Sequence, residues 1–199
     1  MTAVEPLREH VPQPTRRDQI VESARAEFRR TGLAGTSLAA VADAAGVRRT
    51  HLYRYFEDKA DLVSAVVAAE AAAINALRSG ELAGVHDFGE QVVRSLELAV
   101  ELVDSDPFWA SLIEPGNVPY TAYAATQDPD LIASNVAYWT PILETARARG
   151  AMNPALRDDD VMTWLLGLQF LFLERREIFP TPDEVRRYAE QFVLPAIVA

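Results

Sequence analysis

Side chains that could perform catalysis or hold a metal are few in this sequence, and their spacing suits neither task. The 199 residues include no cysteine, and the three histidines, His10, His51 and His86, lie far apart. The sequence has no Glu-x-x-His pair, no glycine-rich phosphate loop followed by lysine, and no plausible Ser-His-Asp set. The three aspartates at 158–160 fit the first turn of a helix, where negative charge complements the helix dipole. The sequence therefore predicts no catalytic site, no metal and no cofactor.

A different chemistry, nucleic-acid binding, is indicated by the segment Leu38–Tyr55. Ala42 is small where the two helices of a helix-turn-helix cross closely, and Gly46, four residues later, can adopt the left-handed conformation that the turn needs. Apolar residues fall where a three-helix core requires contact, at Val41, Ala45, Val47, Leu52 and Tyr55. An ordinary helical hairpin also contains small residues and a glycine, so these positions alone leave both interpretations open.

The charge of the chain is divided unevenly along its length. The net charge is −10, yet residues 1–62 hold 10 Lys and Arg against 9 Asp and Glu, whereas residues 63–199 hold 9 against 20. A protein that is acidic overall can bind phosphate if its cations converge on one surface and its carboxylates lie elsewhere. The charge is compatible with an N-terminal DNA-binding unit but does not establish one.

The composition predicts a soluble, cytoplasmic protein. Apolar residues make up 49% of the chain and charged residues 24%, the ordinary balance of a globular protein. The absence of cysteine fits a reducing compartment, and the N-terminal stretch has no apolar core long enough for a signal peptide. The longest apolar run, Val161–Leu173, is interrupted by Thr163 and Gln169 and is too short to span a bilayer.

The elements that must position these residues are helices, because apolar residues recur with helical period almost throughout. Residues 1–15 hold three prolines and predict a disordered tail. Four helices are expected in the first half. The first ends near Gly32, and the second begins after Thr36 or Ser37 and ends before Gly46. The third covers Arg48–Phe56, and the fourth runs from Asp58 to Gly80. The second half predicts helices over Phe88–Val103, Leu131–Arg149 with a break or kink at Pro141, Val161–Glu177 and Asp183–Leu194. In the last of these, Val185, Tyr188, Ala189 and Phe192 are expected to face inward.

The segment over about residues 16–65 resembles the TetR family of bacterial repressors. The resemblance is carried by GVRRTHLYRYFEDKADL and by the preceding RRDQIVESARAEFRRTGLAGTSLAAVADAAGV. It implies an all-α fold with a helix-turn-helix DNA-binding domain over residues 16–57. A C-terminal helical domain for ligand binding and dimerisation, over residues 58–199, should follow.

The family resemblance also implies which residues meet DNA. The recognition helix should begin near Arg48, and Arg49, Thr50 and His51 should face the major groove with it. Arg49 can donate two hydrogen bonds to a guanine, although contact with phosphate alone is the other possibility. The phenols of Tyr53 and Tyr55 are expected to reach the DNA backbone, and Ser37 to cap the second helix and contact phosphate. Lys59, the only lysine, occupies the position of the family's phosphate-contacting lysine.

For the C-terminal part, the resemblance implies a pocket between the fifth, seventh and eighth helices. We expect a largely apolar effector there, with Trp109, Tyr123, Trp139 and Trp164 as candidate lining residues. No arginine stands out inside an apolar stripe, which argues against a strongly anionic effector. The helices at 158–177 and 183–194 are expected to form the interface of a homodimer, because the first is apolar on nearly all faces.

The prediction that combines these inferences is a TetR-like transcriptional repressor. It should bind a palindromic double-stranded DNA operator as a homodimer and be released by a small, largely apolar effector. Two alternatives remain at this stage, namely a helical-bundle enzyme that uses its pocket for chemistry and a DNA-binding protein that responds to no effector.

Overall fold

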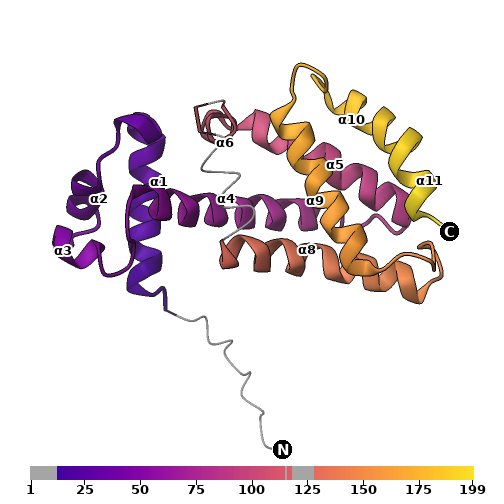
Figure 1. The fold of residues 1–199 in the computed structure, drawn as a ribbon, viewed down its shortest axis with the longest axis horizontal. Helices are drawn as coiled ribbons and strands as arrows, with labels where there is room; N and C mark the ends of the chain where they lie inside the picture. The colour runs from indigo at the N-terminus through magenta and orange to yellow at the C-terminus, as the bar shows by residue number, and fades with distance from the viewer. Residues whose placement is uncertain (1–12, 115, 118–127) are drawn as a thin grey trace, which may run out of the picture.

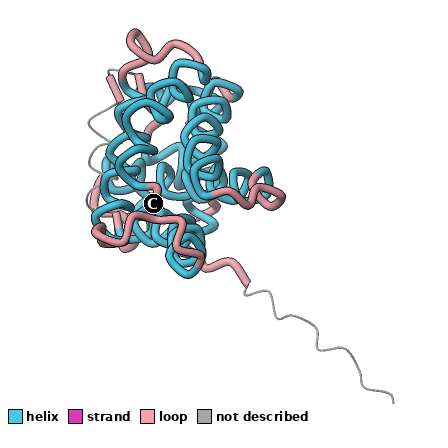
Figure 2. The backbone as a smooth tube through the Cα atoms, turned by 90° about the vertical axis from the view of Figure 1, so that its right-hand side faces the viewer, coloured by secondary structure: helices cyan, strands magenta, loops and turns pink. Residues whose placement is uncertain are grey.

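The computed structural model describes residues 13–114, 116–117 and 128–199, which form helices joined by loops (Figures 1 and 2). The helices are α1 (Arg16–Gly35), α2 (Leu38–Ala44), α3 (Arg49–Leu52), α4 (Lys59–Glu81), α5 (Phe88–Ser105), α6 (Pro107–Leu112), α8 (Pro129–Ala148), α9 (Asp158–Glu174), α10 (Pro182–Tyr188), the π-helical turn η1 (Ala189–Val193) and α11 (Leu194–Ile197). Within these ranges the strand-like pairing is limited to an isolated bridge between Met152 and Val198. The all-α prediction is confirmed.

Local sequence signals set the ends of α1 and α2. Thr15 and Asp18 form a reciprocal capping box at the start of α1, while most of the predicted tail over residues 1–15 lies outside the described residues. Gly32 has a φ of 73° and interrupts the helix where the sequence predicts its end, although helical turns resume up to Gly35. Ser37 rather than Thr36 caps α2, because the buried hydroxyl of Thr36 donates to the carbonyl of Gly32 instead, at 2.8 Å.

The third helix is shorter than predicted. It covers Arg49–Leu52 rather than Arg48–Phe56, and the chain continues through turns. The amide of Arg54 bonds to the carbonyl of His51 at 3.1 Å and that of Tyr55 to the carbonyl of Leu52 at 3.0 Å. These bonds span three residues rather than four, so the helix tightens and ends early.

Helix α4 is the long central element of the fold. Asp58 caps its start as predicted, because its carboxylate accepts from the amide of Asp61 at 2.9 Å. By length and composition alone this helix could cross a membrane, yet half of its most apolar stretch is buried inside the protein. Figure 1 shows it running from the α1–α3 unit along the length of the molecule, with α8 beside it. It acts here as a core helix.

Helices α5, α8 and α9 complete the body around α4. All five residues of the predicted inward stripe of α5 are buried, namely Phe88, Val92, Leu96, Ala99 and Val103. Helix α8 continues through Pro141. The periodicity of the sequence therefore predicts the buried face of α5 correctly.

The end of the chain departs from the predicted single helix. Helix α10 passes into the π turn η1 and then into α11, and the buried positions are Val185, Ala189, Val193 and Ile197. The wider π turn accommodates an extra residue and shifts the face that points inward. Phe192, predicted to face inward, is therefore 53% exposed.

The hydrophobic core consists of two clusters. The first extends from Phe28 in α1 through Val66 in α4 to Trp109 in α6, and the second joins α5, α8, α9 and the C-terminal helices around residues such as Trp139 and Phe172. The first cluster crosses the division at residues 57 and 58 that the sequence analysis expects between the two domains. The α1–α3 unit thus shares one hydrophobic core with α4 and α6.

Candidate nucleic-acid interface and ligand cavity

The turn between α2 and α3 has the geometry of a helix-turn-helix. Val41, Ala42 and Leu52 are buried between the helices, and the amide of Val47 bonds to the carbonyl of Ala42 at 2.9 Å. Gly46 has a φ of 62°, with no heavy atom within 4 Å of the position that a Cβ would take. Its backbone conformation, rather than lack of space, requires glycine there.

Three of the four predicted base-contacting side chains are exposed at the start of α3. Arg48, Arg49 and Thr50 are exposed. The guanidinium of Arg49 donates to the phenol of Tyr53 at 3.2 Å and lies 5.6 Å from the centre of its ring. This contact orders the arginine side chain on the surface of α3 without burying it.

His51 and Tyr55 lie closer to the core than the other candidates. Both are half-buried, with their ring centres 5.5 Å apart. Tyr55 packs against the first hydrophobic cluster. These two side chains therefore lie closer to the core, whereas those of Arg48, Arg49 and Thr50 are exposed.

Ser37 and Lys59 flank this surface at the starts of two helices. The Ser37 hydroxyl accepts from the amide of Ala40 at 3.1 Å, so the side chain caps α2 and remains exposed. The Lys59 ammonium donates to the carbonyl of Leu33 at 2.5 Å. An ammonium has three N–H groups, so this bond leaves it able to contact a phosphate as well.

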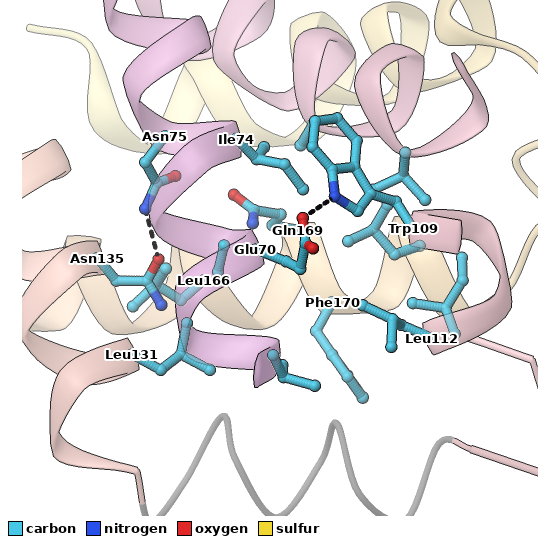
Figure 3. Close-up of a pocket in the computed structure, with 16 residues that line it drawn as sticks. Glu70, Ile74, Asn75, Trp109, Leu112, Leu131, Asn135, Leu166, Gln169 and Phe170 are labelled. Carbon is cyan, nitrogen blue, oxygen red and sulfur yellow. Dashed lines mark hydrogen bonds between the residues drawn. The ribbon is translucent and has the colours of Figure 1, made fainter. Parts of the chain in front are cut away.

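A cavity of about 160 Å³ lies behind the α1–α3 unit, between α4, α5, α6, α8 and α9 (Figure 3). Its wall is mainly apolar. The lining residues are Val67, Glu70, Ala71, Ile74 and Asn75 of α4, Ala99 and Val103 of α5, Trp109 and Leu112 of α6 with the adjacent Ile113, Leu131 and Asn135 of α8, and Leu166, Gln169, Phe170 and Leu173 of α9. All five lining helices belong to the predicted C-terminal domain (residues 58–199), and α4 connects them to the α1–α3 unit.

The four aromatic residues that the sequence analysis expects in the cavity wall do not lie together in the structure. Trp109 lines the cavity. Trp139 lies instead in the second hydrophobic cluster, wholly buried, and Trp164 is 39% exposed. The reason for Trp164 is helical phase, since it lies two residues, or about 200°, from the cavity-lining Leu166. Tyr123 lies outside the described residues.

The charged group in the cavity wall is Glu70, which the sequence analysis does not single out. Its side chain is 1% exposed, and its carboxylate accepts from Arg25 Nε at 2.9 Å, from Arg29 at 3.2 Å and from the indole N–H of Trp109. The pKa of Arg25 is raised, mainly because its guanidinium donates a hydrogen bond to Glu70. Arg29 also pairs with Asp106, the residue that caps α6, at 2.6 Å. Glu70 thus lies on the cavity wall and holds two arginines of α1.

The cavity also has a polar side formed by amides. Asn75 donates to Ser134 and to Asn135, at 3.1 Å each, and accepts from Arg78 at 2.9 Å. The Oε1 atom of Gln169 is buried and has no hydrogen-bond partner among the residues that the structure describes. An unpaired buried acceptor costs free energy, so a ligand that donates a hydrogen bond to Gln169 Oε1 would remove that cost.

Arg78 corrects the expectation that no arginine lies inside the apolar core. It is wholly buried on α4, with its guanidinium 4.1 Å from the centre of the Tyr138 ring. Burial lowers the pKa of Arg78 to about 10. It does not line the cavity, and within the described residues its hydrogen-bond partner is Asn75. The burial of Arg78 could not be predicted from the sequence, because it depends on the other helices that cover α4 on several sides.

Fold and site together define a helix-turn-helix protein whose helical C-terminal part contains a cavity. Residues 20–66 match the family model described as bacterial regulatory proteins, tetR family. Over 51 residues the chain is 45% identical to the HTH-type transcriptional regulator TtgR of Pseudomonas putida. The aligned stretch covers 26% of this chain and 24% of that protein. The match thus spans about a quarter of that relative's length. The N-terminal domain is that of the TetR family of bacterial transcriptional regulators.

Solved structures resemble the chain over most of its length. The structure of RolR in complex with resorcinol has a TM-score of 0.71 at 18% identity and covers 88% of this chain and 84% of that one. FadR from Bacillus subtilis in complex with stearoyl-CoA has a TM-score of 0.57 at 13% identity and covers 87% and 93%. At these identities the likeness shows a shared fold. TtgR and FadR are both named as transcriptional regulators.

Proposed function

We propose that this protein is a homodimeric transcriptional repressor that binds a palindromic DNA operator through α3 and releases it when a small molecule fills the cavity. The DNA-binding part of the proposal is supported by the exposed side chains of Arg48, Arg49 and Thr50 at the start of α3. In a helix-turn-helix, the first residues of the second helix contact base edges in the major groove. Lys59 and Ser37, at the starts of α4 and α2, would contact phosphates.

Dimerisation is supported by apolar side chains exposed in the C-terminal part of the chain. Trp164, Ile178, Phe192 and Val198 are between 38% and 53% exposed. If a second copy of the chain packs there, these groups would be removed from water. A two-fold dimer formed there would place two copies of α3 on one face of DNA, about 34–36 Å apart for successive major grooves.

The single observation that carries the switch is the position of Glu70. Its carboxylate lines the cavity and at the same time bonds to Arg25 and Arg29 of α1, the helix on which the α2–α3 unit packs. A ligand that rearranges the wall around Glu70 would therefore shift α1 and with it α3. RolR and FadR, which share this fold, are solved with resorcinol and with stearoyl-CoA, so the fold can accommodate molecules of very different size.

Site selection from random DNA duplexes tests this function. The full-length protein should enrich a palindrome, and sedimentation of the complex should show two chains per site. Enrichment of no sequence would favour a DNA-bending protein that responds to no effector. A monomer at micromolar concentration that still binds the selected site would contradict the dimer.

A further inference from the structure

The hydrogen-bonding groups of the cavity wall differ in whether they are already used. The indole N–H of Trp109 is donated to Glu70, and the amide N–H groups of Asn75 are donated to Ser134 and Asn135. The acceptor Gln169 Oε1 has no partner within the described residues. A ligand that donates a hydrogen bond to Gln169 Oε1 therefore satisfies a buried acceptor that is unpaired within the described residues.

The charge of the wall points in the same direction. Glu70 presents a carboxylate on the cavity side, whereas Arg25 and Arg29, which compensate it, are not part of the lining. The buried Arg78 is also absent from the lining. An anionic ligand would have to lie beside a carboxylate in a largely apolar space without a cation of its own, which is costly.

A cationic ligand is not required either. The Glu70 carboxylate already accepts from two guanidinium groups and one indole, so a third cation would have to displace one of them. A hydroxyl fits better, because it donates one hydrogen bond and its oxygen can accept from the amide N–H groups of Gln169 or Asn135.

The size of the cavity limits the apolar part of the ligand. A volume of about 160 Å³ is close to that of an engineered apolar cavity of roughly 150 Å³ that binds benzene. We propose that the cavity binds a one-ring or similarly small alcohol or phenol whose hydroxyl donates to Gln169, and that it rejects carboxylates of the same size. This ligand class rests on the proposed function, in which the cavity is the effector site.

Calorimetric titration of the full-length protein without DNA tests the ligand class directly. The probes are phenol, toluene and benzoate, which share one ring and differ in the polar group. Phenol should bind about fivefold more tightly than toluene, which corresponds to roughly 1 kcal/mol for one net hydrogen bond, and benzoate should show no heat of binding. Benzoate binding as tightly as phenol, toluene equal to phenol, or no binding of phenol would each overturn the proposal.

Gln169→Leu assigns the preference to one residue. The variant should bind phenol and toluene equally, and its unliganded form should have a raised Tm because an unpaired buried acceptor is gone. The matched control is Gln91→Leu, which removes a glutamine that donates to the carbonyl of Val85 at 2.8 Å, away from the cavity. It should lower the Tm and keep the phenol preference. A phenol preference that survives in Gln169→Leu would overturn the role of Gln169.

The titration also separates this inference from the proposed function. Phenol binding with an unchanged affinity for the selected DNA would leave the ligand class standing and contradict the switch. Sequence-specific DNA binding together with tight benzoate binding would contradict the ligand class and leave the DNA-binding function standing.

Discussion

The carboxylate of Glu70 in α4 accepts a hydrogen bond from Arg25 Nε in α1 at 2.9 Å, although Glu70 also lines the cavity. One charged group therefore touches both the proposed effector site and the helix that supports the α2–α3 unit. Under the proposed function, a change in the cavity that alters the bonds of Glu70 should shift α1.

Glu70→Gln should weaken the coupling between ligand and DNA. The amide keeps the shape of the side chain but loses the charge that holds Arg25 and Arg29, at a cost of about 1–3 kcal/mol in the free energy of unfolding. Phenol should then change the affinity for the selected DNA much less than in the unmodified protein, as measured by fluorescence anisotropy.

Glu97→Gln is the matched control for this variant. Glu97 is also buried and accepts from two arginines, Arg186 at 2.7 Å and Arg94 at 3.4 Å, but it does not line the cavity. The control should lose stability while it keeps the response to phenol. Equal loss of response in both variants would mean that Glu70 acts through stability alone.

Arg49→Ala should reduce discrimination between DNA sequences. If Arg49 pairs with guanine, its loss costs about 1–3 kcal/mol at particular base positions and little on random DNA. Binding of the variant to single-base substitutions of the selected site measures this. A uniform loss over all sequences would assign Arg49 to phosphate contact.

Lys59→Ala should weaken binding to specific and random DNA alike. Each phosphate contact contributes to the salt dependence, so the slope of log affinity against log salt should fall by about one unit per half-site. Because Lys59 also donates to the carbonyl of Leu33, the Tm of the variant must be measured beside the affinity. An unchanged salt slope with a lowered Tm would make Lys59 a structural residue only.

Gly46→Ala and Gly80→Ala should act in opposite directions. At Gly46 the φ of 62° strains any side chain, so we expect a loss of about 1 kcal/mol in the free energy of unfolding and weaker DNA binding. Gly80 lies inside α4 with open space around it, and alanine there should stabilise by about 0.5–1 kcal/mol. Urea unfolding of both variants measures the difference, and a shift of the same sign in both would contradict the assignment of the turn.

Arg186→Met should destabilise the fold in a pH-dependent manner. The hydrogen bond from Arg186 lowers the pKa of Glu90, so this pairing stabilises the fold above the pKa of the unfolded chain, about 4.3 for glutamate, and is lost as the pH falls through the lowered value. The Tm difference from the unmodified protein should be largest near neutral pH and shrink in acid. A difference that persists unchanged in acid would show that the lost stability comes from packing.

Much of the fold follows from signals that are local in the sequence. The stripe from Phe88 to Val103, the cap at Asp58 and the left-handed glycine at Gly46 each depend on residues within a few turns of one another. The exposure of Arg48, Arg49 and Thr50, by contrast, was expected from the family resemblance. The register shift that exposes Phe192 was not, because a π turn leaves no clear local signal.

The cavity was harder to predict, because its polar residues come from helices far apart in the sequence. From the sequence alone, Glu70 and Arg78 are expected to be exposed charges on α4. They are buried because α1 and α8 cover that helix in the fold. The choice of Trp139 and Trp164 rested on residue type, whereas lining depends on helical phase and on position along the helix. Gln169 was noted in the sequence only as an interruption of an apolar run.

The account depends most on reciprocity between the cavity and the DNA surface. The direct measurement is calorimetric titration of phenol into the free protein and into its complex with the selected DNA. By linkage, a ligand that weakens DNA binding must itself bind the DNA complex more weakly by the same factor, and a coupling of about 1–3 kcal/mol corresponds to roughly 5–150-fold. The account predicts such a loss of phenol affinity in the complex, and equal affinity for the free and DNA-bound protein would contradict it.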